Sequence, residues 1–441
     1  MSVLAKKIRE KAVRLNGALD VTDEILALVG EARFVLIGEA SHGTHEFYEM
    51  RAAITKRLIE EKGFSAVAVE ADFPDAYRVN RFVRGLGNDK TANDALASFT
   101  RFPLWMWRNT DVLEFVEWLK AHNENLETNQ RIGFYGLDLY SLHSSMKSVL
   151  DYLEKVDPNA AKAARNRYSC FDHFGEDAQS YGYAASYDAH FSCEDEAVKQ
   201  LVEMQKSAAE YVNRDELTAR DEFFFAEQNA RLVKNAEEYY RSMFRGRVSS
   251  WNLRDRHMAE TLDELAKHLT LENKASKIVV WAHNSHLGDA RATEMGERGE
   301  WNVGQLARER YKTKACLIGF TTHTGTVAAA DNWDEPAQIK QVRPSHKDSY
   351  ERIFHEAELP EFFLNLLDSE IGELLRRPQL ERAIGVIYRP QTERASHYFT
   401  AVLSEQFDGV IHFDTTRNVV PLDETSNFTH EDAPETFPEG I

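Results

Sequence analysis

The sequence predicts an α/β protein: a mainly parallel central sheet flanked by helices, with a large helical insertion that forms one wall or lid of an active-site cleft. Three observations predict this fold class. Short apolar runs are apolar throughout, as in strands covered on both faces. Helical patterns separate these runs. Several runs end on ionisable residues, and open α/β sheets place their chemistry at the carboxyl ends of their strands.

The expected strands are apolar runs of strand length: Phe34–Glu39, Ala66–Glu70, Ile132–Asp138, Ile278–His283, Ala315–Thr321, Ile384–Tyr388 and Val410–Phe413. Helical patterns lie between the first of these runs, over Phe47–Glu61, Ala71–Arg84 and Thr110–Asn123. Strands that alternate with helices imply right-handed crossovers, and such crossovers produce parallel strands.

The alternation stops after Asp138 and resumes at Lys277. The segment between them reads almost entirely as helix, over Ser144–Val156, Glu194–Arg214, Asp215–Ser242 and Ser250–Leu269. Its many aromatic residues either pack against the sheet domain as core or form a lid over the site, and both arrangements fit the pattern. We therefore divide the chain into the first part of the α/β domain (1–140, with an N-terminal helix), a helical insertion (141–276) and the second part of the α/β domain (277–441).

Composition excludes several classes of function. The 53 basic and 72 acidic residues give a net charge of −19, which repels nucleic acid and anionic membrane surfaces. No run of about 18 apolar residues is present, so no membrane-spanning helix is expected. The first residues lack the features of a signal peptide, and a cytoplasmic protein is expected. The cysteines, Cys170, Cys193 and Cys316, are far apart and odd in number, so neither a disulfide framework nor a zinc cluster is expected.

Ionisable residues gather where the expected strands end. Glu39 and His42 follow the first strand, Glu70 ends the second, and His283 and His286 follow a later one. Titratable groups concentrated at strand ends favour a functional role over a surface or core role. Asp138 ends a further strand, and there the functional and structural interpretations are nearly balanced.

Familiar catalytic signatures do not occur. The chain has no G-x-S-x-G elbow, which argues against an ordinary serine esterase despite Ser41 and Ser285. It also lacks the glycine patterns of dinucleotide and P-loop sites. The pairs His42-Gly-Thr-His45 and His283-Asn-Ser-His286 each have a spacing that could offer two imidazoles to a metal ion.

Four motifs resemble those of the erythromycin esterase family: Gly38-Glu-Ala-Ser-His-Gly-Thr-His-Glu-Phe47, Val69-Glu70, Ser250-Trp-Asn-Leu-Arg-Asp-Arg-His-Met-Ala-Glu260 and Trp281-Ala-His-Asn-Ser-His-Leu-Gly-Asp289. The ending Phe437-Pro-Glu-Gly-Ile441 is similar too. The resemblance covers essentially the whole chain. It implies a hydrolase that cleaves esters or lactones, macrolides among them, with a histidine-activated water and without a metal ion or other cofactor.

The resemblance also implies roles for individual residues. His42 matches the general base, and Glu39, Glu70, His283 and His286 match the other catalytic positions. Arg51 and Arg254 fall within family motifs and are expected to bind substrate in the cleft. The implied partner is a small-molecule ester or lactone, with antibiotic resistance as one consequence if that molecule is a macrolide.

Simple chemistry agrees with these roles. A histidine is suited to accept a proton from water near neutral pH, and a second histidine or an arginine can stabilise the oxyanion. Two alternatives stay open. One is a metal-dependent hydrolase that uses the paired histidines with Glu39 or Glu70, and the other is a non-catalytic protein that binds a small molecule or haem through them.

Overall fold

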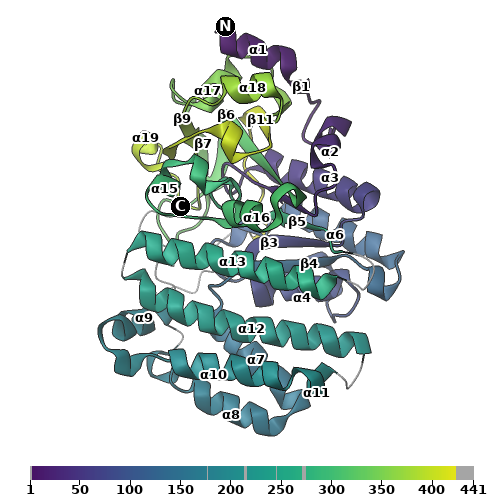
Figure 1. The fold of residues 1–441 in the computed structure, drawn as a ribbon, viewed down its shortest axis with the longest axis vertical. Helices are drawn as coiled ribbons and strands as arrows, with labels where there is room; N and C mark the ends of the chain where they lie inside the picture. The colour runs from purple at the N-terminus through teal and green to yellow at the C-terminus, as the bar shows by residue number, and fades with distance from the viewer. Residues whose placement is uncertain (1, 176, 213–215, 245, 271–274, 424–441) are drawn as a thin grey trace.

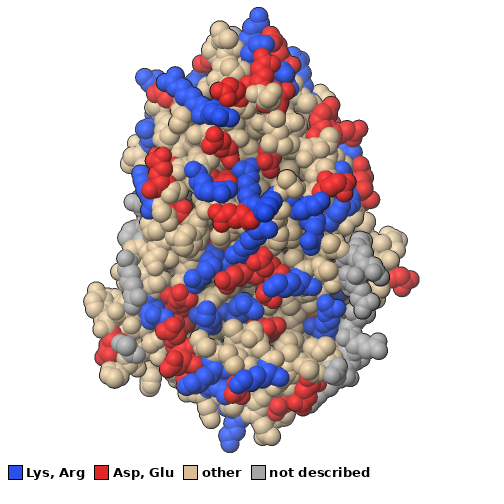
Figure 2. All heavy atoms as spheres, in the orientation of Figure 1, with Lys and Arg blue, Asp and Glu red and all other residues tan. Residues whose placement is uncertain are grey.

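The computed structural model describes residues 2–175, 177–212, 216–244, 246–270 and 275–423 (Figure 1). The acidic C-terminal segment after Asp423, with the closing motif at 437–441, lies outside these residues. Among the described residues no helix is both long enough and apolar enough to cross a membrane. Acidic and basic side chains are mixed over the face seen in Figure 2, so that face carries no single-sign patch.

One mixed sheet forms the centre of the molecule (Figure 1). Its order is β1-β8-β11-β6-β2-β5-β3-β4, with β7 beside β6, and every neighbouring pair from β11 to β4 is parallel. The bounds are β1 (Val13–Arg14), β2 (Phe34–Ile37), β3 (Ala66–Asp72), β4 (Gly133–Asp138), β5 (Ile278–Trp281), β6 (Ala315–Ala329), β7 (Gln338–Val342), β8 (Glu361–Asn365) and β11 (Gly409–Thr416). A mainly parallel sheet flanked by helices confirms the predicted fold class.

The helices fall into three groups along the chain. Before β4 lie α1 (Val3–Lys11), α2 (Asp23–Val29), α3 (His45–Lys62), α4 (Phe73–Val83), α5 (Ala92–Leu96) and α6 (Thr110–Glu124). Between β4 and β5 lie α7 (Leu142–Val156), α8 (Pro158–Tyr168), α9 (Ala178–Tyr187), α10 (Glu194–Lys206), α11 (Ala208–Val212), α12 (Glu216–Met243) and α13 (Arg247–Leu269). After β5 lie α14 (Asn284–Leu287), α15 (Glu294–Glu297), α16 (Val303–Tyr311), α17 (Tyr350–His355), α18 (Ser369–Leu374), α19 (Glu393–Ser396) and α20 (Leu403–Gln406).

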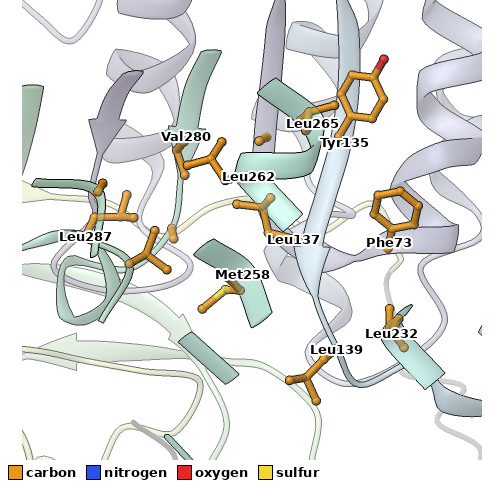
Figure 3. Close-up of a cluster of buried hydrophobic side chains, with 14 of the residues drawn as sticks. Phe73, Tyr135, Leu137, Leu139, Leu232, Met258, Leu262, Leu265, Val280 and Leu287 are labelled. Carbon is orange, nitrogen blue, oxygen red and sulfur yellow. The ribbon is translucent and has the colours of Figure 1, made fainter. Parts of the chain in front are cut away.

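The central strands are buried on both faces because their side chains alternate between two hydrophobic clusters. In β2, Phe34 and Leu36 belong to one cluster, whereas Val35 and Ile37 belong to the other. Figure 3 shows part of the first cluster, where side chains of α13 pack against those of β4 and β5. Continuously apolar strands therefore follow from a sheet covered by helices on both sides.

The helices of the insertion stack beyond β4, with α13 nearest the sheet and α12 next (Figure 1). Many of the aromatic residues that the sequence left open between core and lid are buried in the first hydrophobic cluster. These are Tyr168, Phe171, Tyr181, Phe223 and Phe224, and for them the structure supports the core interpretation. Helix α13 is the part of the insertion that reaches the site.

The expected strand at Ile384–Tyr388 is not a strand. Its backbone hydrogen bonds go to two different segments: the Ile384 N–H donates to the carbonyl oxygen of Ala40, and the Tyr388 N–H donates to the carbonyl oxygen of Ala330. Only isolated bridges result. A short apolar run marks burial but does not reveal whether a neighbouring strand runs alongside it.

The cysteine expectation also needs correction. Cys170 and Cys193 form a disulfide, with Cα atoms 5.9 Å apart, and Cys316 is free and buried. The chain reverses direction through α9 between the two cysteines, which sequence spacing did not reveal. A second, small antiparallel sheet of β9 (Gln379–Arg382) and β10 (Tyr398–Ala401) was likewise unpredicted, because its strands are short and partly polar.

Candidate active site

The candidate site lies at the carboxyl ends of β2, β3, β4 and β5, which are neighbours in the sheet. Strand β2 ends at Ile37, and the tight turn after it carries Glu39 and His42 before α3 begins at His45. Gly38 is required here, because a Cβ at this position would lie 2.1 Å from the Asn284 Oδ1 atom. The close approach brings the turn after β2 against the turn after β5.

His42 is oriented by Glu39. The His42 Nδ1 atom lies 2.7 Å from Glu39 Oε1, and both side chains are buried. Arg51 Nη2 lies 3.0 Å from the second Glu39 oxygen and forms an ion pair with it. Since a carboxylate accepts, Nδ1 of His42 donates, and the lone pair of the neutral ring then lies on Nε2.

His283 has the opposite tautomer. The Ser285 backbone N–H donates to His283 Nδ1 at 3.2 Å, and the Ser285 hydroxyl lies 2.8 Å from the same atom. Nδ1 therefore accepts, which places the proton on Nε2. Burial and the neighbouring His42 hold the pKa of His283 well below its usual value, so the ring is neutral. Its Nε2 is buried without a hydrogen-bond partner among the described residues.

The two rings face each other across the site. The ring centroids of His42 and His283 are 4.9 Å apart, with an angle of 53° between the planes. The two rings are therefore in contact, and one of them carries a lone pair on Nε2 whereas the other carries an N–H group. Both residues line the same pocket.

His286 lies between two carboxylates. Its Nδ1 is 3.0 Å from both oxygens of Asp255, its Nε2 is 3.3 Å from Glu70 Oε1, and its ring stacks on Trp251. Burial lowers the pKa of an imidazole, but Asp255 and Glu70 outweigh burial and raise the pKa of His286 to about 9. Nη1 of Arg254 also lies 3.1 Å from Nε2. Arg254 can donate to Nε2 only while the ring is neutral, whereas in the charged ring the Nε2–H group pairs with Glu70.

Arg254 connects two strand ends from α13. It donates to both oxygens of Asp138, at 3.0 and 2.6 Å, and to Glu70 Oε1 at 2.8 Å. The other Glu70 oxygen accepts the backbone N–H of His283 at 2.8 Å. Burial alone would raise the pKa of Glu70, but His286 and Arg254 lower it well below its usual value. The Glu70 carboxylate therefore stays ionised and holds the β5 turn in place.

A cavity of about 100 Å³ opens onto these groups. The turns after the strands supply its polar groups, and Met106 of the short helix Leu104–Met106 lines it too. The described residues that line it are His42, Glu70, Ala71, Asp72, Asp75, Phe99, Arg101, Phe102, Pro103, Met106, Trp107, Asp138, Tyr140, Arg254, His283, Ser285, His286, Trp333, Gly385 and Val386. Its apolar wall thus comes mainly from the segment 99–107 and Trp333.

The structure brings together most residues that the sequence singled out. The pocket is lined by His42, Glu70, Arg254, His283 and His286, and Glu39 lies directly behind His42. Arg51 is different. Its side chain is fully buried and stacks on the rings of Tyr48 and Trp281, at 4.3 and 5.2 Å. It pairs with Glu39 and is not among the residues that line the pocket, so a direct contact with substrate stays a prediction.

Sequence reasoning missed several partners. Asp255 lies within an ordinary helical pattern, and only its place beside Arg254 in one motif could have pointed to it. Phe102 and Trp333 lie in irregular segments where aromatic residues have no diagnostic spacing. Ser285 was considered only as a nucleophile, whereas its backbone N–H fixes the tautomer of His283.

The paired histidines do not form a metal cage in this arrangement. Across the described ranges, no three His, Cys, Asp or Glu side chains are grouped as metal ligands are. His42 directs Nδ1 to Glu39, and His286 directs Nδ1 to Asp255, so each ring has one nitrogen committed to a carboxylate.

Fold and site define the class: an α/β protein with a pocket of histidines and carboxylates at the carboxyl edge of its parallel strands. The chain belongs to the erythromycin esterase family, whose sequence model matches residues 59–416. Family membership confirms the resemblance seen in the motifs. Together with the names of relatives, it identifies a hydrolase similar to these esterases, and the family indicates a small-molecule substrate.

Individual relatives are distant. YbfO of Bacillus subtilis (strain 168), which carries the name of a hydrolase, is 25% identical over 404 residues, covering 86% of this chain and 82% of that one. Erythromycin esterase type II of Escherichia coli is 22% identical over 336 residues, covering 72% and 76%. A solved Bacillus cereus protein superposes with a TM-score of 0.77 at 19% identity over 95% and 98% of the two chains. A mutant of the erythromycin esterase EreC in its open conformation superposes with a TM-score of 0.65 at 18% identity over 89% and 93%.

Proposed function

We propose that this protein hydrolyses carboxylic esters or lactones by direct attack of a water molecule that His42 deprotonates. One observation carries the proposal: two neighbouring imidazoles, with centroids 4.9 Å apart, are held in complementary tautomers. Glu39 leaves His42 with a lone pair on Nε2, and Ser285 leaves His283 with an N–H on Nε2. A base and a hydrogen-bond donor in one pocket are what water attack on a carbonyl requires.

In this mechanism Nε2 of His42 accepts the proton as water adds to the carbonyl carbon. The imidazolium that forms is stabilised by Glu39, to which Nδ1–H already donates at 2.7 Å. His42 then returns the proton to the departing alkoxide. No acyl-enzyme forms, which agrees with Ser41 being bonded to Thr44 at 2.5 Å instead of to a histidine.

The His283 N–H stabilises the oxyanion. A neutral donor that has no partner among the described residues can form its hydrogen bond as charge develops on the carbonyl oxygen, so it favours the transition state. The cation His286 and Arg254 add positive potential behind it. Glu70, bonded to the His283 backbone, fixes the position of this donor.

The cavity sets limits on the substrate. At about 100 Å³, it is smaller than the roughly 300–1,000 Å³ typical of pockets for drug-sized ligands. A small acyl or lactone group fits beside the histidines as the pocket stands. A macrolide, which is the substrate that the name of the Escherichia coli relative points to, would require the wall formed by 99–107 to move outward.

The test is turnover against a panel of a phenyl ester, a small lactone and a macrolide, with intact-protein mass spectrometry during turnover. We expect hydrolysis of at least one small ester and no covalent adduct. An acyl group trapped on Ser41 or Ser285 would contradict direct water attack. Absence of hydrolysis for the whole panel, with ligand binding retained, would favour a binding protein.

A further inference from the structure

Asp75 is a pocket carboxylate that forms no ion pair among the described residues. It lies in the first turn of α4 and lines the cavity. The neighbouring Asp72 binds Arg101 at 2.8 Å, and the remaining pocket carboxylates, Glu70 and Asp138, bind Arg254. For the Asp75 carboxylate, the described part of the chain supplies no hydrogen bond or ion pair; the Ser98 hydroxyl contacts only its backbone oxygen.

The cations nearest to Asp75 are committed elsewhere. Arg101 is engaged by Asp72, and Arg78 is engaged by Asp89 through two hydrogen bonds of 3.0 and 2.7 Å. Burial and the negative charge of Asp72 raise the pKa of Asp75 to about 8, although Arg101 and Arg78 oppose them. A buried carboxyl in this state gains most from a ligand that brings its own positive charge.

Aromatic side chains line the same cavity as Asp75. Phe102 and Trp333 are in contact, with centroids 4.8 Å apart, and Phe99 lies 6.2 Å from Trp107. All of them line the pocket. The faces of aromatic rings attract organic cations, most strongly when the cation is partly desolvated. A carboxylate beside aromatic faces therefore favours an ammonium group over a neutral one.

Independent polar groups show where the rest of a ligand lies. The Nε2–H of His283, in a side chain only 2% exposed, is a donor without a partner among the described residues and lies in the same cavity. The Oδ1 atom of Asp72 is a buried acceptor that likewise has no hydrogen-bond partner in the described ranges. The cavity thus offers a donor to a carbonyl oxygen and acceptors to a cation.

We propose that the pocket recognises esters that carry a protonated amine or quaternary ammonium group, with the ester carbonyl at His42 and His283 and the cation between Asp75 and the aromatic wall. The role of the ester rests on the proposed function, whereas the cation site does not. A metal ion fits poorly here, because no three ligating side chains converge in the described ranges.

Matched esters test this proposal. Acetylcholine and 3,3-dimethylbutyl acetate have nearly the same shape, but only the first is charged. We expect the full-length protein to show a kcat/KM at least about tenfold higher for acetylcholine, since each factor of ten corresponds to about 1.4 kcal/mol of recognition. In Asp75→Asn the ratio of kcat/KM for acetylcholine to kcat/KM for 3,3-dimethylbutyl acetate should fall towards one. Asp195→Asn removes an exposed carboxylate on α10 and should keep the wild-type ratio.

Binding of the alcohols separates the cation site from the chemistry. Calorimetry with choline and its neutral analogue 3,3-dimethylbutan-1-ol should show tighter binding of choline to the wild type, and a loss of about tenfold or more in Asp75→Asn. Choline affinity should also rise between about pH 7 and pH 8.5 as Asp75 loses its proton, and this rise should vanish in the variant. Trp333→Leu leaves the carboxylates in place. It should lower the affinity for choline more than the affinity for the neutral alcohol.

The outcomes are distinguishable. Equal binding of choline and its neutral analogue, or an Asp75→Asn protein with wild-type choline affinity, would overturn the cation site even if neutral esters are hydrolysed. Preferential choline binding without hydrolysis of either ester would support the cation site and contradict the proposed function. Thermal unfolding of each variant verifies that it is folded.

Discussion

At the scale of single residues, the site depends on which nitrogen of each histidine carries the proton. The sequence placed His42 and His283 at strand ends, but it could not assign their tautomers. Those depend on Glu39, one turn away from His42, and on the backbone N–H of Ser285. Residue types at strand ends can be read from a sequence, whereas hydrogen-bond partners require the geometry of the turns.

His283 provides the first prediction. His283→Ala should lower kcat by about 10²–10³ with a small change in KM, because removal of one oxyanion donor typically has this effect. His283→Gln retains an N–H group and should recover part of the rate. Steady-state kinetics with a small neutral ester would measure both. A rise in KM at unchanged kcat would show that His283 only binds the ground state.

His286 gives the fold a predicted pH dependence. Its pKa of about 9 in the folded protein lies above the value of about 6.5 expected for an unfolded chain. The stabilisation is therefore complete below about pH 6.5 and is lost as the pH rises through 9. Because a tenfold difference in proton affinity corresponds to about 1.4 kcal/mol, the free energy of unfolding should fall by on the order of 3 kcal/mol across this range.

Urea unfolding of the wild type and of His286→Gln at several pH values measures this contribution. The difference between the two proteins removes the effect of other groups that titrate in the range, such as Asp75. The fall should be smaller in the variant by the contribution of His286. Parallel pH curves for both proteins would show that His286 is not a cation in the folded state.

At the scale of elements, burial on both faces made the central strands predictable. The strands β2, β3, β4, β5, β6 and β11 each overlap a predicted apolar run, although β6 continues beyond Thr321 to Ala329. Strand β7 at Gln338–Val342 escaped prediction because it carries polar side chains at the edge. The segment Ile384–Tyr388 was predicted as a strand but is not one. It is buried and apolar, but its backbone N–H groups donate to two separate segments, at Ala40 and at Ala330, instead of to one neighbouring strand.

Aromatic residues divide between two elements with different functions. Phe99, Phe102 and Trp107 line the pocket. Many aromatic residues of the insertion form core instead, as Tyr181 does with its 2.6 Å hydrogen bond to Glu237, whereas Tyr183 and Tyr187 are exposed. Phe102→Leu should therefore change KM or substrate preference more than stability. Tyr181→Phe should cost about 1–3 kcal/mol of unfolding free energy, because buried polar groups lose a partner, and leave kcat unchanged. Steady-state kinetics and chemical unfolding of both variants measure these effects. A loss of stability without a change in KM for Phe102→Leu, or a change in kcat for Tyr181→Phe, would contradict the prediction.

At the scale of the whole molecule, the site is assembled from all three parts of the chain. Strand β2 from the first part lies between β5 and β6 from the last, and Arg254 arrives from the insertion to bind Glu70 and Asp138. The sequence predicted this meeting of strand ends. It could not predict that Arg51 would lie behind Glu39, because a family motif does not specify which face of α3 a side chain takes.

The same assembly predicts insensitivity to metal removal. No three His, Cys, Asp or Glu side chains among the described residues are grouped as metal ligands are, and proton transfer requires the lone pair on Nε2 of His42 to stay free of a metal. Activity should therefore be unchanged after dialysis against EDTA. Activity that is lost in EDTA and restored by one divalent metal would favour the metal-dependent hydrolase.

The turnover of His42 variants tests the central claim most directly. General-base removal typically costs about 10²–10⁴ in rate, so His42→Ala should lose nearly all turnover of a small ester. The variant also leaves the buried Glu39 carboxylate without its His42 partner, so some loss of stability is expected, and thermal unfolding verifies that the protein is folded. His42→Gln should not recover activity, because an amide can hold a water but cannot accept its proton. Ser41→Ala should remain close to wild type, since no acyl-enzyme is proposed. A folded His42→Ala protein with ordinary turnover would contradict the account.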